Sequence, residues 1–492
     1  MAEHVEGGDL SAARLRKLDA IRELGVDPFP RKFERTHQSA DLVADFERFE
    51  GHEVRVAGRI VGAIRHMGKA GFANILDGGG RIQIHFRRDS LGEAGFALYR
   101  ELDVGDFIGV HGVPFRTKTG EPTIEARSLT FLAKAIRPLP EKWHGLTDVE
   151  KRHRQRYLDL IANQEVRNVF AARTRIVRSV RRFLDDRGFL EVETPMMQAV
   201  ASGAAARPFT TFSNALDQEL YLRIAIELFL KRCIVGGIER VYEIGRIFRN
   251  EGLSYKHNPE FTMLELYQAY ADYEAIMELV EQLVSHVALD VMGTTSLEWK
   301  GEPIELAPPW PRRRLQELIL EYAGVDYLEY PDDEMLRSAA SRAGLEVDRS
   351  WNRAKVIDEL STVFVEPRLV QPTFVVDYPV ETTPLAKRRP SQPDEVERFE
   401  AYIGGMEIAN AFSELNDPVE QRRRFDEQVA QRAAGDEEAQ ALDEDFLVAV
   451  EHGMPPTGGL GIGIDRLVMV LTNQPSIRDV ILFPQLRSRD TR

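Results

Sequence analysis

The stretch that decides the fold is residues 241–270, VYEIGRIFRNEGLSYKHNPEFTMLELYQAY. Apolar and polar residues alternate on both sides of the polar segment 250–259, which predicts two strands joined by a loop. Because successive side chains of a strand point to opposite faces, Phe261, Glu265 and Tyr267 share one face of the second strand. With Arg249 at the end of the first strand, this face predicts a cavity suited to a charged, planar ligand. Taken alone, an arginine and a glutamate in a hairpin more often form a surface ion pair.

Around this hairpin the chain alternates between helical and extended patterns without a long series of βαβ units. A helix is expected at residues 165–187, ended by Gly188 and followed by the strand FLEVETP. A helix-rich stretch runs from Tyr273 to about Val365, and strands return before a closing helix after Gly463. This order predicts an α+β domain with a mostly antiparallel sheet flanked by helices.

The N-terminal part has a different pattern. Five alternating runs between residues 54 and 133, with a helix after the third, predict a five-stranded OB-fold barrel of the kind that binds oligonucleotides. Gly78-Gly79-Gly80 predicts the turn between its second and third strands. We therefore expect four parts: a helical extension at 1–50, the barrel at 51–137, a linker at 138–160 and the α+β domain at 161–492. The α+β domain is expected to carry a helical insertion at about 286–365.

Composition excludes several classes of protein. The 492 residues hold one cysteine, Cys233, so neither an internal disulfide nor a thiolate metal cluster can form. The net charge of −15 argues against a chain that coats nucleic acid by bulk attraction. We find no apolar run long enough for a membrane span and no secretory signal at the N-terminus, so a cytoplasmic protein without a membrane partner is expected.

Two further segments carry candidate chemistry. In residues 398–417, RFEAYIGGMEIANAFSELND, a turn at Ile403-Gly404 would place Glu400 opposite Glu407, a like-charge pair that Mg²⁺ would neutralise. A solvated acidic hairpin is the alternative interpretation. In the same segment Asn410, Phe412 and Glu414 share a face, so Glu414 could join Glu265 in an acidic pocket.

The second segment is GLGIGIDRL, residues 459–467, a glycine-rich strand that turns into a helix with Arg466 at its start. Backbone donors and the helix dipole at such a turn favour an anionic phosphate. By itself the pattern also fits an ordinary glycine-rich turn before a core helix.

Taken together, these segments resemble the class II aminoacyl-tRNA synthetases. RNEG with HNPEFTMLELY is similar to the second signature motif of the lysine-specific, bacterial-type branch, and GLGIGIDRL resembles the third. The helix and strand that end in Glu193-Thr194-Pro195 resemble the first, which in that family builds a homodimer interface. The resemblance covers nearly the whole chain.

The resemblance implies a role for each matched residue. L-lysine would be bound by Gly203, Glu227, Arg249, Glu265, Tyr267, Asn410 and Glu414, under a mobile loop at residues 202–209. ATP would be bound by Arg249, Glu251, His257, Asn258, Phe261, Glu400, Glu407 and Arg466. Among these, Arg249 and Arg466 would be catalytic, and Glu400 and Glu407 would hold Mg²⁺. In the barrel, the anticodon of tRNA(Lys) would be bound by Arg65, Phe72 and Gln83.

The chain departs from the family pattern near the expected lysine pocket. Ala409 and Ala411 replace glycines that many lysyl enzymes have on both sides of Asn410, and Ile226 replaces a proline. The added methyl groups are expected either to narrow the pocket or to be absorbed by the strand.

The resemblance thus implies a lysine–tRNA ligase that forms lysyl-adenylate and transfers lysine to tRNA. Three alternatives remain at this point. A related enzyme for aspartate or asparagine would need a cationic pocket, whereas Glu265 and Glu414 are acidic. A transferase that modifies a protein would lack the barrel, and a binding paralogue without ATP chemistry would not need Arg249, Glu407 and Arg466.

Overall fold

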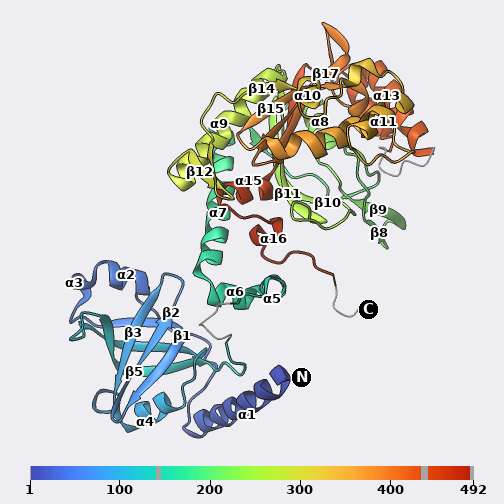
Figure 1. Ribbon diagram of the computed structural model, residues 1–492. Helices are drawn as coiled ribbons and strands as arrows, with labels where there is room; N and C mark the ends of the chain where they lie inside the picture. The colour runs from blue at the N-terminus through green and yellow to red at the C-terminus, as the bar shows by residue number, and fades with distance from the viewer. Residues whose placement is uncertain (1, 140–145, 434–440, 488–492) are drawn as a thin grey trace. The chain divides into compact units, whose positions relative to one another are not determined.

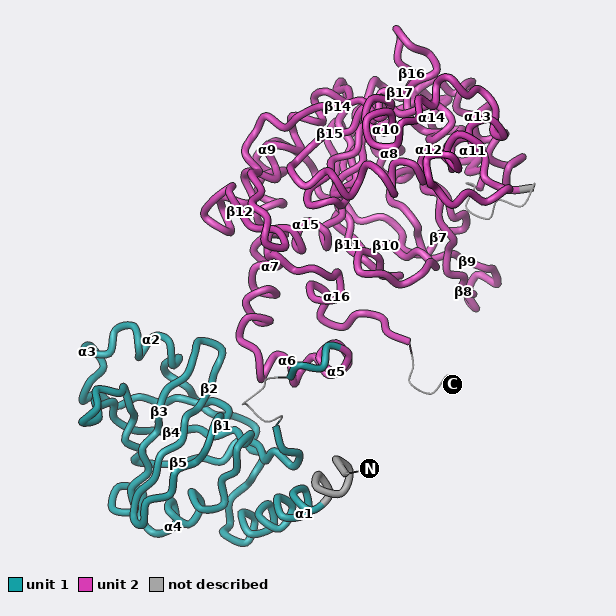
Figure 2. The backbone as a smooth tube through the Cα atoms, in the orientation of Figure 1, with its two compact units in different colours: residues 1–149 teal, residues 150–492 magenta. Residues whose placement is uncertain are grey.

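The computed structural model describes residues 2–139, 146–433 and 441–487. Two compact units divide the chain, Met1–Val149 and Glu150–Arg492 (Figure 2). The predicted linker at 138–160 is only partly described, because residues 140–145 lie outside these ranges. Among the described residues, no helix combines the length and the apolar character that a membrane crossing requires.

The first unit contains a closed barrel of five antiparallel and parallel strands in the order β1-β2-β3-β5-β4. Its elements are β1 (Val54–Met67), β2 (Ala70–Leu76), β3 (Arg81–Arg87), α4 (Arg88–Arg100), β4 (Phe107–Arg116) and β5 (Pro122–Ala133). The helices α1 (Ala2–Glu23), α2 (Ser39–Ala44) and α3 (Phe46–Phe49) precede them. The prediction of five strands with a helix after the third is confirmed. The glycine turn forms as expected, with the Asp77 carboxylate accepting hydrogen bonds from the amides of Gly79 and Gly80 at 2.8 and 2.9 Å.

The second unit is built on a mostly antiparallel sheet in the order β14-β15-β17-β18-β19-β11-β10-β6, with β16 paired to β17 (Figure 1). The strands are β6 (Leu190–Glu191), β10 (Arg240–Phe248), β11 (Glu260–Ala269), β14 (Arg312–Arg314), β15 (Thr373–Pro379), β16 (Arg388–Arg389), β17 (Gln392–Ile403), β18 (Met406–Ser413) and β19 (Thr457–Gly463). Only the pairs β10/β6 and β14/β15 of this sheet are parallel. The predicted α+β class is therefore confirmed.

One face of this sheet is covered by the helices α7 (Gln164–Asp185), α9 (Tyr273–Met292) and α15 (Ile464–Leu471). Alternate residues of the central strands, among them Leu264, Leu266, Leu460 and Ile462, pack into the apolar core beneath these helices. Their neighbours in sequence point to the opposite face, because side chains alternate along a strand. The polar residues of the predicted hairpin therefore lie on the face away from this core.

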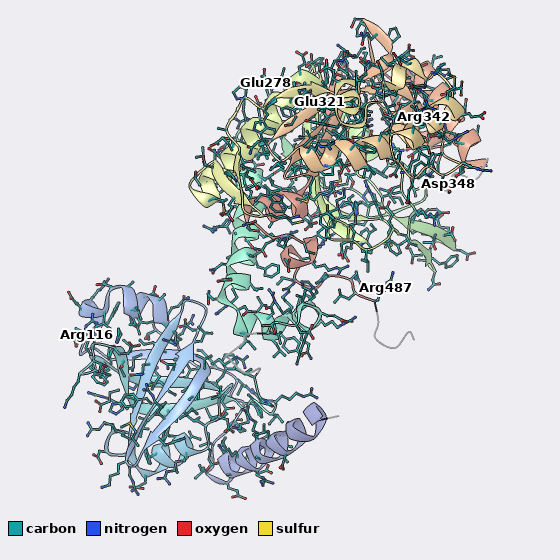
Figure 3. The ribbon with its side chains drawn as sticks, in the orientation of Figure 1. Arg116, Glu278, Glu321, Arg342, Asp348 and Arg487 are labelled. Atoms are coloured by element: carbon teal, nitrogen blue, oxygen red, sulfur yellow. The ribbon has the colours of Figure 1, made fainter. Side chains whose placement is uncertain are left out.

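The chain also contains shorter helices. They are α5 (Val149–Arg154), α6 (Arg156–Ala162), α8 (Glu227–Val235), α10 (Leu315–Ala323), α11 (Asp333–Arg342), α12 (Arg353–Leu360), α13 (Pro418–Ala433), α14 (Glu444–Glu451) and α16 (Ile477–Val480). Two small sheets join β7 (Met197–Gln198), β8 (Thr210–Ser213) and β9 (Gln218–Leu222), and β12 (Ser296–Trp299) with β13 (Glu302–Glu305). Figure 3 labels Glu321 on α10, Arg342 on α11 and Asp348 beyond it, in a region with its own apolar core.

The predicted register of the β17/β18 hairpin is wrong. The turn consists of Gly404-Gly405, both with positive φ (63° and 72°), instead of Ile403-Gly404. A bulge between Ala401 and Tyr402 shifts the pairing further, so that Glu400 lies opposite Asn410 and Glu407 opposite Tyr402. The two acids are therefore not a directly paired cross-strand couple, although both face the same cavity.

Candidate active site

A cavity of about 1400 Å³ opens on the face of the sheet away from α7, α9 and α15. Its floor is formed by the strand residues that alternate with the core: Met263, Glu265 and Tyr267 of β11, Asn410 and Phe412 of β18, and Gly459 and Gly461 of β19. Successive side chains of these strands thus point alternately into the cavity and into the core, as the sequence pattern predicts. All seven residues predicted to bind lysine line this one cavity: Gly203, Glu227, Arg249, Glu265, Tyr267, Asn410 and Glu414.

Three carboxylates are buried at one end of the cavity. Glu227, Glu265 and Glu414 are only 8%, 4% and 1% exposed. The backbone amide of Ile226 donates a hydrogen bond to Glu265 Oε1 at 3.0 Å, and the Tyr267 hydroxyl donates to Oε2 at 3.4 Å. Burial raises the pKa of Glu265 to about 7, and the Ile226 amide partly offsets this effect.

Glu414 is the most deeply buried of the three carboxylates. Its Oε2 forms an ion pair with the buried ammonium of Lys231, whereas Oε1 is buried without a hydrogen-bond partner among the described residues. Burial raises its pKa well above the usual range. Lys231 supplies one positive charge against three buried carboxylates, and buried negative charge without a counter-charge is costly, so this end of the cavity favours a further cation.

Space for the Glu414 carboxylate comes from a glycine of the third signature. A Cβ atom on Gly459 would lie 1.8 Å from Glu414 Oε1 and 2.6 Å from Tyr267 Cε1. The acidic pocket therefore requires a glycine at position 459 of β19. This requirement is separate from the phosphate-binding turn that the sequence predicts for the same strand.

Lys231 is a functional candidate that the sequence analysis missed. It lies on α8 with its side chain fully buried, 2.5 Å from Glu227 Oε1 and in contact with Glu414. A signal was available in the segment LFLKRCIV, where a lysine interrupts an apolar helix one turn after Glu227. Arg398 was also missed, and its guanidinium donates to Glu400 at 2.6 Å and to Asn410 at 3.2 Å.

The other end of the cavity is more cationic. Arg466, in the first turn of α15, donates to the Glu407 carboxylate at 2.9 Å and to the Glu407 carbonyl at 2.7 Å. Its second terminal nitrogen lies 3.3 Å from His257 Nε2. Burial and the charge of Arg466 lower the pKa of His257 to about 4, so its imidazole is neutral at pH 7.

Four of the residues predicted to bind ATP, Arg249, Glu251, His257 and Asn258, lie in the loop between β10 and β11, and Phe261 follows at the start of β11. The Arg249 guanidinium lies 5.4 Å from the centre of the Phe261 ring. Asn258 is buried and donates to the Glu260 carbonyl at 2.6 Å, whereas its Oδ1 has no partner among the described residues. The amide of Glu251 donates to the Arg249 carbonyl at 2.9 Å. Arg249, Glu400 and Glu407 line the cavity. Phe261 and Arg466 contact two of these residues, Arg249 and Glu407, and His257 contacts Arg466. Glu251 and Asn258 are not among the residues that line the cavity.

Glu400 and Glu407 form an acidic pair at this end of the cavity. Glu400 accepts hydrogen bonds from the hydroxyls of Tyr378 and Tyr402 at 2.9 and 2.5 Å. Burial raises the pKa of Glu400 to about 7, and Glu407 adds to this effect against the opposing charge of Arg398. Each acid pairs with an arginine, Glu400 with Arg398 and Glu407 with Arg466, and the Glu407 side chain is 35% exposed. The carboxylate oxygens of the two acids match the ligand preference of Mg²⁺.

The two alanines that replace family glycines do not narrow the cavity. Ala409 and Ala411 are 2% and 1% exposed and pack into the core beneath α9 and α15. They alternate with Asn410, whose side chain lines the cavity. The strand therefore absorbs both methyl groups on its other face.

On the barrel, the three residues predicted to read the anticodon lie on neighbouring strands. Arg65 is paired with Phe72 across β1 and β2, with its guanidinium 5.7 Å from the ring centre. His85, which sequence analysis missed, stacks on Phe72 at 4.4 Å. Gln83 is buried and accepts a hydrogen bond from Thr123 at 3.0 Å. These side chains alternate with Ala73, Ile82 and Ile84 of the barrel core, so they point to the outer face of the barrel, where Gln83 is itself covered by its neighbours.

Comparison with known proteins gives the class of protein first. Residues 148–487 match the family described as tRNA synthetases class II (D, K and N), and residues 54–132 match the OB-fold nucleic acid binding domain. The chain belongs to the class II tRNA synthetases, with an OB-fold domain before the catalytic unit.

The relatives then identify the branch of that family. The chain is 58% identical over 482 residues to the lysine–tRNA ligase of Moorella thermoacetica, with 98% of both chains covered. It is 55% identical to that of Syntrophomonas wolfei, again covering 98% of both, and 54% identical to that of Roseiflexus castenholzii, covering 99% and 100%. The chain therefore groups with the lysine–tRNA ligases of the class II family.

Proposed function

We propose that this protein is a lysine–tRNA ligase, which activates L-lysine with ATP and then transfers it to tRNA(Lys). The observation that carries the proposal is the acidic end of the cavity, where the carboxylates of Glu227, Glu265 and Glu414 are buried together and only one ammonium group of the described residues, that of Lys231, forms ion pairs with them. The side-chain ammonium of lysine supplies further positive charge and hydrogen-bond donors. An uncharged side chain would leave the excess negative charge of the three acids unbalanced, which gives the site its selectivity.

In the first step the lysine carboxylate attacks the α-phosphorus of ATP, forming lysyl-adenylate as the bond to pyrophosphate breaks. Arg249 holds the attacking carboxylate, and Glu227 and the backbone at Gly203 hold the α-amino group. Arg249 and Arg466 place positive charge where negative charge develops on the phosphate. Neither arginine exchanges a proton, so catalysis comes from alignment and electrostatic stabilisation.

Glu400 and Glu407 are the residues that would hold Mg²⁺. The fit rests on their chemistry, because carboxylate oxygens are the ligands that Mg²⁺ prefers, both acids line one cavity, and the charge of Glu407 raises the pKa of Glu400. The metal ion would neutralise charge on the ATP phosphates during transfer. Phe261 would stack on adenine, with Glu251, His257 and Asn258 around the nucleotide.

In the second step a hydroxyl of the terminal ribose of tRNA attacks the adenylate carbonyl, and AMP leaves. The barrel supplies recognition, with Phe72 and Arg65 offering stacking surfaces and Gln83 an amide that reads a base edge. Because the reaction uses tRNA and ATP, we place the protein in the cytoplasm. We retain the division into parts 1–50, 51–137, 138–160 and 161–492 as part of this proposal.

We also propose that two copies of the chain associate through the first signature segment. Its strand β6 and the residues after it carry exposed apolar side chains, since Leu190, Met196 and Met197 are 52%, 48% and 58% exposed. Clustered apolar exposure of this kind is typical of a protein interface. Sedimentation equilibrium would give twice the chain mass for such a homodimer and the single mass without it.

The first test of the function is ATP–pyrophosphate exchange with each of the twenty amino acids, without tRNA. Exchange that depends on lysine and on Mg²⁺ would support the proposal, because it requires reversible formation of the adenylate. Exchange with another amino acid would overturn the assignment of the pocket. Absence of exchange with every amino acid would overturn the catalytic proposal and favour a binding protein.

A further inference from the structure

A buried ammonium group lies directly beneath the proposed lysine pocket. Lys231 extends from α8 with a fully buried side chain, 2.5 Å from Glu227 and in contact with Glu414. Three aromatic rings surround its Nζ at 5.5–6.0 Å, those of Tyr267, Phe412 and Phe446. The protein therefore places a cation of its own between two of the acids proposed to bind the substrate.

The charge on Lys231 is maintained by its neighbours. Burial disfavours its charged form, but Glu227 and Glu414 outweigh this effect and raise the pKa of Lys231. A buried ion pair contributes little to stability compared with an apolar replacement of the same volume, whereas removal of one partner is strongly destabilising. A buried cation at this place is thus better explained by the charge that it gives the pocket than by stability.

The charges of the pocket can be counted. Glu227, Glu265 and Glu414 carry three negative charges when ionised, and Lys231 cancels one of them. Two negative charges then remain, the number of ammonium groups on lysine, while Arg249 is left for the substrate carboxylate. The negative charge of the pocket equals the number of ammonium groups on lysine only if the charge of Lys231 is included.

We propose that Lys231 is a positioning residue that fixes the net charge of the ionised pocket at minus two and thereby selects a substrate with two ammonium groups. This inference rests on the proposed function, because it assigns the two charges to the α-amino and side-chain ammonium groups of lysine. Lys231 acts through Glu227 and Glu414 and does not contact the reacting atoms.

The test is a double-mutant cycle in ATP–pyrophosphate exchange, with wild type, Lys231→Met, Glu414→Gln and the double variant. Glu414→Gln leaves a pocket of net charge minus one, so the KM for lysine should rise about 100-fold. Adding Lys231→Met restores the count of two. The double variant should therefore have a KM for lysine about tenfold lower than Glu414→Gln alone, with the KM for ATP unchanged.

A lower KM for lysine in the double variant than in Glu414→Gln distinguishes a role of Lys231 in pocket charge from a role in supporting the fold. If Lys231 only supported the fold, the double variant would be worse than Glu414→Gln, and that result would overturn the inference. The same holds if the double variant does not fold, by circular dichroism, while Glu414→Gln does. Failure of Lys231→Met alone to fold does not affect the comparison between the other two variants.

The matched control is Lys134→Met, which removes a buried lysine that is paired with Asp103 and Asp106 in the barrel. It should leave the KM for lysine unchanged in both the wild-type and the Glu414→Gln backgrounds. The wild type separates the two proposals. No lysine-dependent exchange by the wild type would overturn the proposed function and this inference together, whereas normal wild-type exchange without rescue would overturn the role of Lys231 alone.

Discussion

At the scale of single residues, burial of Glu265 lowers the stability of the ligand-free protein, whereas its charge is proposed to select lysine. Its folded pKa of about 7 lies above the ordinary glutamate value of 4.5, because the carboxyl is buried. Below about pH 4.5 the group is protonated in both the folded and the unfolded state. Stability therefore falls as the pH rises from about 4.5 to about 7, where the folded protein retains a proton that the unfolded chain has released, and it levels off above that range. Each pKa unit corresponds to about 1.4 kcal/mol, so ionising Glu265 in the empty pocket costs on the order of 3 kcal/mol.

Glu265→Gln should consequently stabilise the ligand-free protein at pH 8 while greatly reducing lysine activation. The expected gain is about 1–3 kcal/mol at pH 8 and much less at pH 5, where the wild-type carboxyl is protonated. Thermal unfolding at the two pH values measures the gain, and lysine-dependent exchange measures the loss. Glu278→Gln, on the exposed side of α9 (Figure 3), is the control and should change neither. Unchanged lysine turnover in Glu265→Gln would remove Glu265 from the binding role.

Ile226 provides a second test at the same scale. Its amide donates to Glu265 and lowers the pKa of that carboxyl. Proline, which the family pattern often has at this position, has no N–H group. Ile226→Pro should therefore raise the pKa of Glu265 further. The KM for lysine is expected to fall as Glu265 ionises, so this fall should move to higher pH. The expected displacement is about one pH unit, since a hydrogen bond to a charged group is worth about 1.5 kcal/mol.

The measurement is lysine KM between pH 6 and pH 9. Ile226→Ala keeps the N–H group and serves as the control, so its profile should retain the wild-type midpoint even if KM changes. Coincident profiles for the proline and alanine variants would show that the Ile226 amide does not tune Glu265.

At the scale of elements, strand β19 joins the two ends of the cavity. Its glycines pass beneath the acidic pocket, and the strand then turns into α15, which carries Arg466. Gly459 lies opposite Tyr267 on β11 and Phe412 on β18, so three adjacent strands meet where Glu414 needs room. Close packing leaves no space for a methyl group there.

Gly459→Ala should thus displace Glu414 and raise the KM for lysine by at least about tenfold, because the new Cβ would overlap a carboxylate oxygen. The KM for ATP should change little. Gly463→Ala on the same strand is the matched control, since its Cβ would meet only the Arg466 side chain at 3.7 Å or more, an ordinary contact. Equal effects of the two substitutions on lysine KM would contradict this account of β19.

At the scale of the whole molecule, the two compact units carry separate parts of the proposed function. The cavity with its acids lies in the second unit, and the stacked Phe72 and His85 lie on the barrel of the first. Activation of lysine needs only the cavity, whereas transfer to tRNA also needs recognition by the barrel. The two activities should therefore respond to different substitutions.

Phe72→Ala should raise the KM for tRNA in aminoacylation by about 10- to 100-fold, since a base stacked on an aromatic ring is worth about 1–3 kcal/mol. Lysine-dependent exchange without tRNA should be unchanged. Phe29→Ala removes a half-exposed aromatic ring in the same unit and should affect neither assay. Equal aminoacylation by wild type and Phe72→Ala would exclude Phe72 from tRNA recognition.

The sequence by itself determined the features that depend on local pattern. Period-two alternation separated the cavity residues Glu265 and Tyr267 from the core residues Leu264 and Leu266, and the order of strands predicted both the barrel and the antiparallel sheet. These succeed because the face of a strand residue follows from chain geometry alone.

Only the tertiary structure decided how distant segments meet. The register of Glu400 and Glu407 depended on which glycines form the turn and on a bulge, which the alternation pattern does not encode. Lys231 read as one residue of an apolar helix, and its partner Glu414 lies 183 positions later in the chain (414 − 231). Burial and ion pairing between such segments are properties of the packed fold, so the charge balance of the pocket became visible only there.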